Sequence, residues 1–316
     1  MSAYIVCTLF EKHYHFGVAA LINSLYKNGF RGDFFCGFKG DFPPWAISAV
    51  DNQSIKWKGA KSMTINEGLL VHFLPLQVGC HLANYKADFM LGLIEGAGSE
   101  VEGIAYFDPD IIVKCKWEFY EKWMDYGVAL VHEVTSNDMP ASHPVRKGWE
   151  EVAEKCNLGI NRSLTSYINS GFCGVSKKNY EFLVLWSFLT EVAIKDYRVD
   201  ATQFMPNDRT HLFFACDQDA LNVAAMCTSA ELSEIGPEGM DFTYGGWTMS
   251  HAIGSPKPWK KKFLLSALKG EPPSLADKGF WQNAETPIPA YSSFLVKNKQ
   301  MQISMASFLG RFYRKY

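Results

Sequence analysis

The chain lacks several features that would place it in a specialised class of protein. No run of about 18 apolar residues occurs in its 316 residues, so we expect no membrane-spanning helix. The first residues, MSAYIVCTLFEKHYHF, contain no basic segment followed by a long apolar one, so we expect no signal peptide. Internal repeats and low-complexity linkers are also missing, which favours a globular protein without repeat architecture.

Cysteine pairing and excess positive charge are absent as well. The eight cysteines are dispersed, no two form a C-x-x-C pair, and several lie in apolar runs where free cysteine acts as a small hydrophobe. A reduced, cytoplasmic protein is therefore the simplest expectation. The net charge of −2 gives no indication of a nucleic acid partner.

The first 40 residues indicate the fold class. A β-branched, apolar run at residues 3–9 predicts a buried strand, and residues 16–28 carry apolar side chains at helical spacing. Gly29 is placed to end that helix, and residues 33–37 predict a second strand. Strand, helix and strand in this order predict parallel pairing with a right-handed crossover, hence an α/β protein.

The rest of the chain continues the alternation of strands and helices. Two segments rich in turn residues, 135–147 and 245–259, are expected to be loops. Further helices are expected at residues 84–94, 117–126, 180–194 and 216–226, and strands at residues 103–113, 127–132 and 167–175.

Two carboxylates interrupt the apolar segment 103–113, which reads GIAYFDPDIIV. Pro109 removes a backbone donor, so the chain should leave the sheet between Asp108 and Asp110. Ligand sites of α/β sheets lie at the carboxyl ends of strands, and hard divalent cations take carboxylates together with substrate phosphates. The pattern therefore predicts a metal–diphosphate site. The alternative is a plain turn, which Asp beside Pro also favours.

Polar residues stand in two other segments that are expected to be structured. Asn169 and Ser170 lie inside an apolar strand, where they either end the strand at a bulge or hydrogen-bond a polar ligand. Asp217 and Asp219 precede an apolar helical run, so Asp217 could cap that helix and the helix dipole could favour the charge of Asp219. Gln218 between them has no capping role.

The segment HAIGSPKPW from residue 251 to 259 is the most specific of these patterns. His251 can ligate a transition ion such as manganese. Gly254 would allow close approach of the backbone to phosphate oxygens, and Lys257 would neutralise their charge.

Taken in order, these segments resemble the retaining glycosyltransferases of family eight, relatives of glycogenin and of bacterial lipopolysaccharide galactosyltransferases. The resemblance covers roughly residues 4–260 and rests on the opening strand and helix with ALINSL, together with Asp108-Pro109-Asp110, Asn169-Ser170-Gly171-Phe172, Asp217-Gln218-Asp219 and His251-x-x-Gly254-x-x-Lys257-Pro258-Trp259.

The resemblance implies a GT-A fold, a Rossmann-like, mostly parallel sheet flanked by helices, and a nucleotide-sugar donor, usually a UDP-sugar. By position, Asp108, Asp110 and His251 would bind manganese, with magnesium as a substitute. Gly254 and Lys257 would hold the diphosphate, assisted by Lys86.

The resemblance also assigns the residues around the donor. Asn169, Asp217 and Gln218 would contact the donor sugar, with Gln218 on its reacting face and Asp219 as its acidic neighbour. The family holds the nucleotide base and ribose with the segment after the first strand, so Thr8 is a candidate donor-binding residue. That segment contains a single acidic residue, Glu11.

These expectations define a GT-A domain at residues 1–260, a C-terminal helical extension at 261–316, and a hexosyltransferase with a saccharide or glycolipid acceptor. Two alternatives remain open: a sugar-nucleotide nucleotidyltransferase and a non-catalytic nucleotide-sugar binder. The basic, aromatic end of the chain, ISMASFLGRFYRKY, could contact an anionic membrane surface peripherally or form a packed terminal helix.

Overall fold

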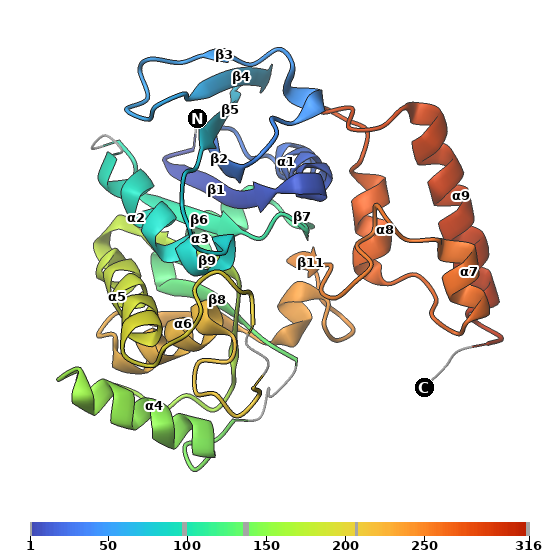
Figure 1. Ribbon diagram of the computed structural model, residues 1–316. Coiled ribbons are helices and arrows are strands. Elements are labelled where there is room, and N and C mark those ends of the chain that lie inside the picture. Colours follow the sequence, from blue (N-terminus) through green and yellow to red (C-terminus); the bar gives the residue numbers. More distant parts are fainter. Residues whose placement is uncertain (1, 97–99, 135–138, 206–207, 314–316) are drawn as a thin grey trace.

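A mixed β-sheet with helices on both faces forms the centre of the molecule (Figure 1). The computed structural model describes residues 2–96, 100–134, 139–205 and 208–313. Within these residues the main sheet has nine strands in the order β10-β8-β9-β6-β1-β2-β5-β4-β3. The α/β class expected from the sequence is confirmed.

The direction of the strands divides the sheet. β5, β2, β1 and β6 pair in parallel, whereas β9 runs antiparallel to both β6 and β8. The parallel strand–helix–strand opening is confirmed. The strands are β1 (Tyr4–Glu11), β2 (Asp33–Lys39), β3 (Val50–Asp51), β4 (Lys61–Asn66), β5 (Leu69–Pro75), β6 (Gly103–Phe107), β8 (Val128–His132), β9 (Ile168–Ser176) and β10 (Leu232–Ile235).

Helices on the two faces of the sheet enclose separate cores, because alternate residues of a strand point to opposite faces. On β1, Cys7 and Leu9 pack toward α2 and α5, whereas Val6 and Phe10 pack toward α1. The helices are α1 (His15–Lys27), α2 (Lys86–Gly96), α3 (Trp117–Tyr126), α4 (Pro144–Lys155), α5 (Glu181–Lys195), α6 (Cys216–Cys227), α7 (Phe263–Leu268), α8 (Leu275–Gln282) and α9 (Ser293–Leu309), with a 3-10 turn η3 (Leu82–Tyr85) before α2.

A two-stranded ribbon lies outside the main sheet. β7 (Ile111–Val113) pairs antiparallel with β11 (Met249–His251), and Ile111 stands opposite His251. The expectation that residues 245–259 are entirely loop is therefore wrong at β11. A strand of three residues is too short to show a period of two in the sequence.

The expectation that residues 135–147 form a loop is also partly wrong. Residues 135–138 lie outside the described residues, but α4 begins at Pro144, inside the segment expected to be irregular. Proline is tolerated in the first turn of a helix, where its missing N–H would have no partner. His143 caps the helix, because its Nδ1 accepts a hydrogen bond from the Val145 amide at 3.2 Å.

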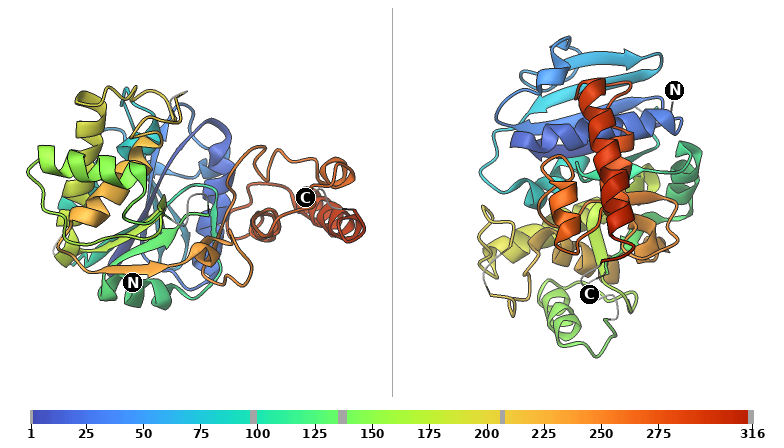
Figure 2. Two further views of the ribbon diagram at one scale, coloured as in Figure 1. Left: turned by 90° about the horizontal axis from the view of Figure 1, so that it is seen from below. Right: turned by 90° about the vertical axis from the view of Figure 1, so that its right-hand side faces the viewer.

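The C-terminal helices α7, α8 and α9 stand together at one side of the main body (Figure 2). They share a core with Ala20 of α1 and Ile112 of β7. The buried Asn23 side chain joins the two parts, since its Nδ2 donates to the carbonyls of Asn283 and Ile288 at 2.8 and 3.0 Å. Among the described helices, none is both long and apolar enough to span a membrane. The domain boundary at residue 260 stays a prediction.

Candidate active site

Asp108 and Asp110 leave the sheet at the end of β6, as the sequence predicts. Asp110 is buried, and the side chain of Asp108 is 22% exposed. Helix α1 reaches this turn through Gly17, because a Cβ atom at that position would lie only 2.1 Å from the Pro109 carbonyl oxygen. The absence of a side chain at Gly17 therefore lets α1 support the turn that carries both carboxylates.

His251 reaches the two aspartates through the β7–β11 ribbon. Its Nε2 lies 3.3 Å from Asp110 Oδ1 and 3.7 Å from Asp108 Oδ2. One ligand atom from each of the three residues lies within 4.8 Å of the others. Gly171 of β9 leaves room for the imidazole, since a Cβ there would lie 2.5 Å from His251 Cε1.

This cluster fits a divalent metal ion by its chemistry. Two carboxylates and one imidazole combine oxygen and nitrogen ligands, a set that suits manganese better than magnesium. Among the described residues, the buried Nδ1 of His251 has no hydrogen-bond partner, and Nε2 is the ring nitrogen that faces the two carboxylates. The three residues predicted as metal ligands are therefore brought together in a form that could hold such an ion.

Lys86 connects the candidate metal ligands to helix α6. Its Nζ lies 3.1 Å from Asp108 Oδ1 and 3.0 Å from Asp217 Oδ2, and the side chain is buried. Burial works against the charged form, but the two carboxylates outweigh it and raise the pKa of Lys86 above its ordinary value. Lys86 is thus a fixed cation between two parts of the site.

Lys257 is the second cation of the site. Its Nζ contacts Asp110 Oδ2 at 2.5 Å and also donates to the Ala252 carbonyl at 2.8 Å. Burial disfavours the charge of Asp110, but His251 and Lys257 outweigh that effect and hold the pKa of Asp110 well below its usual range. Gly254 lies on the exposed loop between His251 and Lys257 with φ +80°, a backbone conformation that favours glycine.

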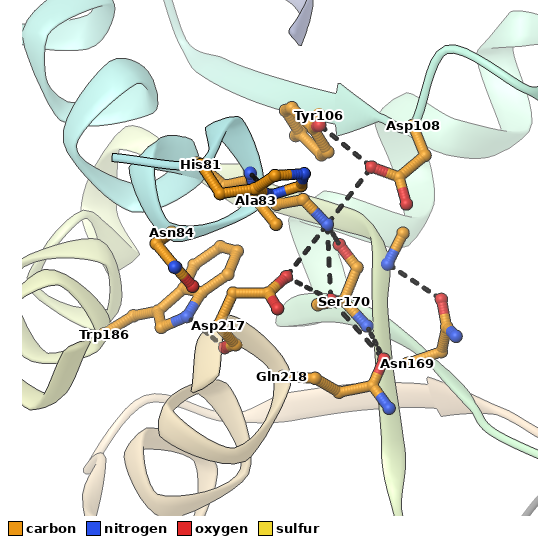
Figure 3. A network of polar contacts seen from close by, with 12 residues as sticks. His81, Ala83, Asn84, Tyr106, Asp108, Asn169, Ser170, Trp186, Asp217 and Gln218 are labelled. Atoms are coloured by element: carbon orange, nitrogen blue, oxygen red, sulfur yellow. Dashed lines mark hydrogen bonds and ion pairs between the residues drawn. The ribbon is translucent and has the colours of Figure 1, made fainter. Parts of the chain in front are cut away.

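Ser170 of β9 is the junction of a polar network beside this cluster (Figure 3). Its Oγ donates to Asp217 Oδ2 at 2.7 Å, and its backbone N–H donates to Gln218 Oε1 at 3.0 Å. Lys86 Nζ donates to the Ser170 carbonyl at 3.2 Å. The network therefore runs without a break from Asp108 to Gln218.

Asn169 is held from two sides. Its Nδ2 donates to Glu133 Oε2 at 2.5 Å, and its Oδ1 accepts from the Gly171 amide at 2.7 Å. The register between β8 and β9 shifts here, since Leu130 pairs with Cys173 whereas Val131 pairs with Asn169. The bulge expected as one alternative for this segment is present, and the other alternative, hydrogen bonding to a polar ligand, stays a prediction.

Asp219 lies in the first turn of α6, on the buried side of the helix. Its Oδ1 accepts from the Tyr167 hydroxyl at 2.6 Å and its Oδ2 from the Ala215 amide at 2.7 Å. Burial raises the pKa of Asp219 to about 7, although both hydrogen bonds act in the opposite direction. The proposed N-cap at Asp217 is wrong, because the N-cap position is Ala215 and Asp219 binds that residue's backbone N–H.

The remaining donor-binding candidate, Thr8, is not brought into this network. Its side chain is fully buried in β1, and among the described groups its hydroxyl has no hydrogen-bond partner. The role of Thr8 stays a prediction. The other candidates lie close together, around the carboxyl end of β6 and the start of α6: Asp108, Asp110, Asp217, Asp219, His251, Lys86, Lys257, Asn169 and Gln218. Gly254 lies on the adjoining loop.

Sequence reasoning did not assign roles to three residues of the network: Tyr106, Glu133 and Tyr167. Tyr106 donates to Asp108 Oδ1 at 2.9 Å, and its position two residues before the aspartate on a strand could have indicated a shared face. Glu133, by contrast, follows β8 and meets Asn169 only through strand pairing. No local pattern marks that contact.

Comparison with solved structures supports the fold. Neither a protein-family model nor a curated protein sequence matches the chain. The bifunctional glycosyltransferase WbbM aligns over 95% of this chain and 52% of its own, with TM-score 0.57 and 15% identity. GlyE of Streptococcus pneumoniae TIGR4 aligns over 95% of this chain and 63% of its own, with TM-score 0.52 and 13% identity.

The galactosyltransferase LgtC, solved with donor and acceptor sugar analogues, aligns over 93% of this chain and 99% of its own, with TM-score 0.51 and 12% identity. Another LgtC structure is an active-site mutant with Glu in place of Gln. The chain thus spans about half to two thirds of WbbM and GlyE and nearly all of LgtC. At these identities the likeness concerns the fold, and the expected GT-A glycosyltransferase fold is confirmed.

Proposed function

We propose that the protein is a metal-dependent glycosyltransferase that transfers a hexosyl group from a nucleotide sugar to a saccharide or glycolipid acceptor, with net retention. The observation that carries this proposal is the Asp108–Asp110–His251 cluster at the strand ends of a glycosyltransferase fold. A UDP-sugar is the expected donor and manganese the expected ion, with magnesium as a substitute.

The residues of the site divide into two groups in this proposal. Lys257 and the Gly254 loop would bind the donor diphosphate, and a bound metal ion would supply Lewis-acid stabilisation of that leaving group. Such a leaving group needs no carboxylic acid to protonate it, in contrast to many glycoside hydrolases. Asn169, Asp217 and Gln218 would orient the donor sugar.

Charge supports the binding of metal and diphosphate together. The two lysines do not neutralise the three carboxylates around them, so the cluster attracts a divalent cation, and the cation then attracts a diphosphate. The carboxylates are Asp108, Asp110 and Asp217, and the lysines are Lys86 and Lys257. We expect the nucleotide sugar to bind far more tightly with the ion than without it.

Calorimetry and thermal shift with UDP-glucose, UDP-galactose and UDP-N-acetylglucosamine, each with and without manganese, test the proposal. One donor should raise the melting temperature only when manganese is present. Asp110→Ala should abolish that shift, whereas Asp51→Ala removes a surface carboxylate of β3 and should leave it unchanged.

The outcome also separates the alternatives. Release of UDP from the bound donor identifies a transferase, and binding without turnover identifies a non-catalytic nucleotide-sugar binder. If no nucleotide sugar binds under any metal condition, the proposed function is wrong.

A further inference from the structure

Each aspartate of the candidate metal cluster has one side-chain oxygen that the protein holds and one that faces His251. Asp110 Oδ2 contacts Lys257 Nζ at 2.5 Å, whereas Asp110 Oδ1 lies 3.3 Å from His251 Nε2. Asp108 Oδ1 contacts Lys86 Nζ at 3.1 Å, whereas Asp108 Oδ2 lies 3.7 Å from His251 Nε2. A carboxylate can bind an ion through one oxygen or through both, so these contacts bear on how the cluster would hold a metal.

Asp108 Oδ1 has a second partner, the hydroxyl of Tyr106, at 2.9 Å. A phenol keeps its proton at neutral pH, so Tyr106 donates and the ionised carboxylate accepts. Two donors from different elements therefore meet at one oxygen of Asp108, the phenol from β6 and the ammonium of Lys86 from α2 (Figure 3).

The fold turns the two oxygens of Asp108 toward different layers of the molecule. Tyr106 packs in the core beneath α2 and α5, and Lys86 Nζ lies 5.3 Å from the centroid of its ring. Ile111, in the ribbon that carries His251, packs instead in the core on the α1 side of the sheet. The Asp108 carboxylate thus stands between the two layers, with Oδ1 held from the α2 side and Oδ2 turned toward the ribbon.

Lys86 alone does not fix the direction of this carboxylate. Its Nζ is shared with Asp217 Oδ2 at 3.0 Å and with the Ser170 carbonyl at 3.2 Å, and an ammonium acts as a point charge on a flexible stem. The ring of Tyr106 is rigid and the residue is only 1% exposed, so its hydroxyl has a fixed position. The phenol therefore adds a direction to the charge that the lysine supplies.

We propose that Tyr106 is a positioning residue of the metal site: together with Lys86 it holds Asp108 Oδ1, so that Asp108 presents Oδ2 alone to the ion. A group that orients a ligand in this way raises metal affinity without touching the ion. The inference rests on the metal dependence of the proposed function, and it is independent of the identity of the sugar, the nucleotide and the acceptor.

Manganese titration of the protein without any nucleotide sugar tests the inference, with free manganese measured by electron paramagnetic resonance. Tyr106→Phe removes the hydroxyl and keeps the ring, so we expect the manganese dissociation constant to rise about tenfold to a hundredfold.

Tyr4→Phe is the matched control. Tyr4 is also buried in a strand, and its hydroxyl also donates to an aspartate, Asp125. Tyr4 stands opposite Gly103, however, at the amino ends of β1 and β6, whereas the metal cluster lies at the carboxyl end of β6. The manganese dissociation constant of Tyr4→Phe should equal that of the wild type.

Thermal unfolding in the presence of EDTA separates positioning from a general loss of stability. Each substitution deletes one hydrogen bond, so both variants should unfold cooperatively within several degrees of the wild type. A loss of manganese affinity in Tyr106→Phe alone would then belong to the metal site.

Infrared difference spectra of the wild-type protein, recorded with and without manganese, give a second measurement that needs no variant. A carboxylate bound to a metal through one oxygen separates its antisymmetric and symmetric stretching bands more widely than one bound through both. We expect the wider separation, in bands that shift when aspartate is labelled with ¹³C.

Equal manganese affinity of Tyr106→Phe and the wild type would overturn the inference, as would the infrared signature of an aspartate bound through both oxygens. Failure of the wild type to bind manganese would overturn the manganese site and the inference together. Weakened manganese binding in Tyr106→Phe, combined with no binding of any nucleotide sugar to the wild type, would support the inference and overturn the proposed function alone.

Discussion

Among single residues, Asp219 has the clearest effect of burial on ionisation. Its carboxyl is buried, receives hydrogen bonds from Tyr167 and the Ala215 amide, and has a pKa of about 7. Because the folded protein holds this proton more tightly than the unfolded chain, Asp219 lowers the free energy of unfolding progressively as the pH rises from about 4 to about 7.

Asp219→Asn should remove this dependence. We expect the free energy of unfolding of the wild-type protein to fall more steeply between pH 4 and pH 7 than that of Asp219→Asn. Over this pH range the free energy of unfolding of the wild-type protein should fall by at most about 4 kcal/mol more than that of the variant, at roughly 1.4 kcal/mol per pKa unit. Urea denaturation at several pH values measures these free energies of unfolding. If the values for the two proteins change with pH in parallel, Asp219 is ionised at every pH tested.

The sequence predicts the candidate metal ligands better than it predicts the residues that hold the site in place. Asp108, Asp110 and His251 stand in short patterns whose residue types indicate metal binding, and the structure brings them together. Ser170 and Tyr167 act through contacts with a helix about 50 residues away, which depend on strand register and on a bulge. Register is set by the packing of the whole sheet and leaves no local signal.

Between elements, the close contact of α1 with the Asp108–Asp110 turn is the tightest constraint on the candidate metal ligands. Gly17 lies on the helix face against Pro109, and the nearest atoms to an added Cβ are the Pro109 carbonyl oxygen at 2.1 Å and carbon at 3.0 Å. Both are backbone atoms, so the turn itself would have to move.

Gly17→Ala should therefore destabilise the protein by about 1–3 kcal/mol, as overpacking usually does, and weaken manganese binding at least about tenfold. Gly92→Ala in α2 is the matched control, because an added Cβ there meets no atom within 4 Å. That substitution should stabilise the protein by about 0.5–1 kcal/mol. Calorimetric unfolding and manganese titration test both, and unchanged manganese binding in Gly17→Ala would contradict the prediction.

The long elements were predictable because their patterns are local. The helices at α1, α3 and α5 and the strand at β9 follow apolar periodicity closely. The sequence failed at β11 and at the start of α4, where a three-residue strand and a proline in a first turn both resemble loop. The sequence therefore does not predict the β7–β11 ribbon, although it predicts His251, the candidate metal ligand that the ribbon carries.

For the whole molecule, helix α9 leaves an apolar stripe uncovered. Val296, Ile303 and Ala306 are buried against α7 and α8, whereas large apolar side chains on the rest of the helix and just beyond it are exposed: Phe294, Met301, Met305, Phe308 and Phe312. Arg311 lies beside the last of these. The remaining basic residues of the tail, Arg314 and Lys315, lie outside the described residues.

We propose that this stripe contacts an anionic membrane surface peripherally. Flotation with phosphatidylglycerol vesicles should recover the wild-type protein, and the double variant Phe308→Ser and Phe312→Ser should reduce recovery several-fold. Ile47→Ser removes an exposed apolar side chain far from α9 in the sequence and serves as the control. Equal recovery of the double variant would exclude a membrane role for the stripe.

The β7–β11 ribbon gives the candidate site an order of assembly. On the ribosome the chain emerges from its N-terminus, and domains begin to fold as they appear. Asp108 and Asp110, in the turn between β6 and β7, emerge well before His251, which must wait for β11 to pair across the ribbon. A nascent chain that has released β1 to β7 therefore holds two of the three candidate metal ligands. Pairing of β11 with β7 completes the cluster, so a metal ion acquired during synthesis would be held firmly only after β11 has emerged.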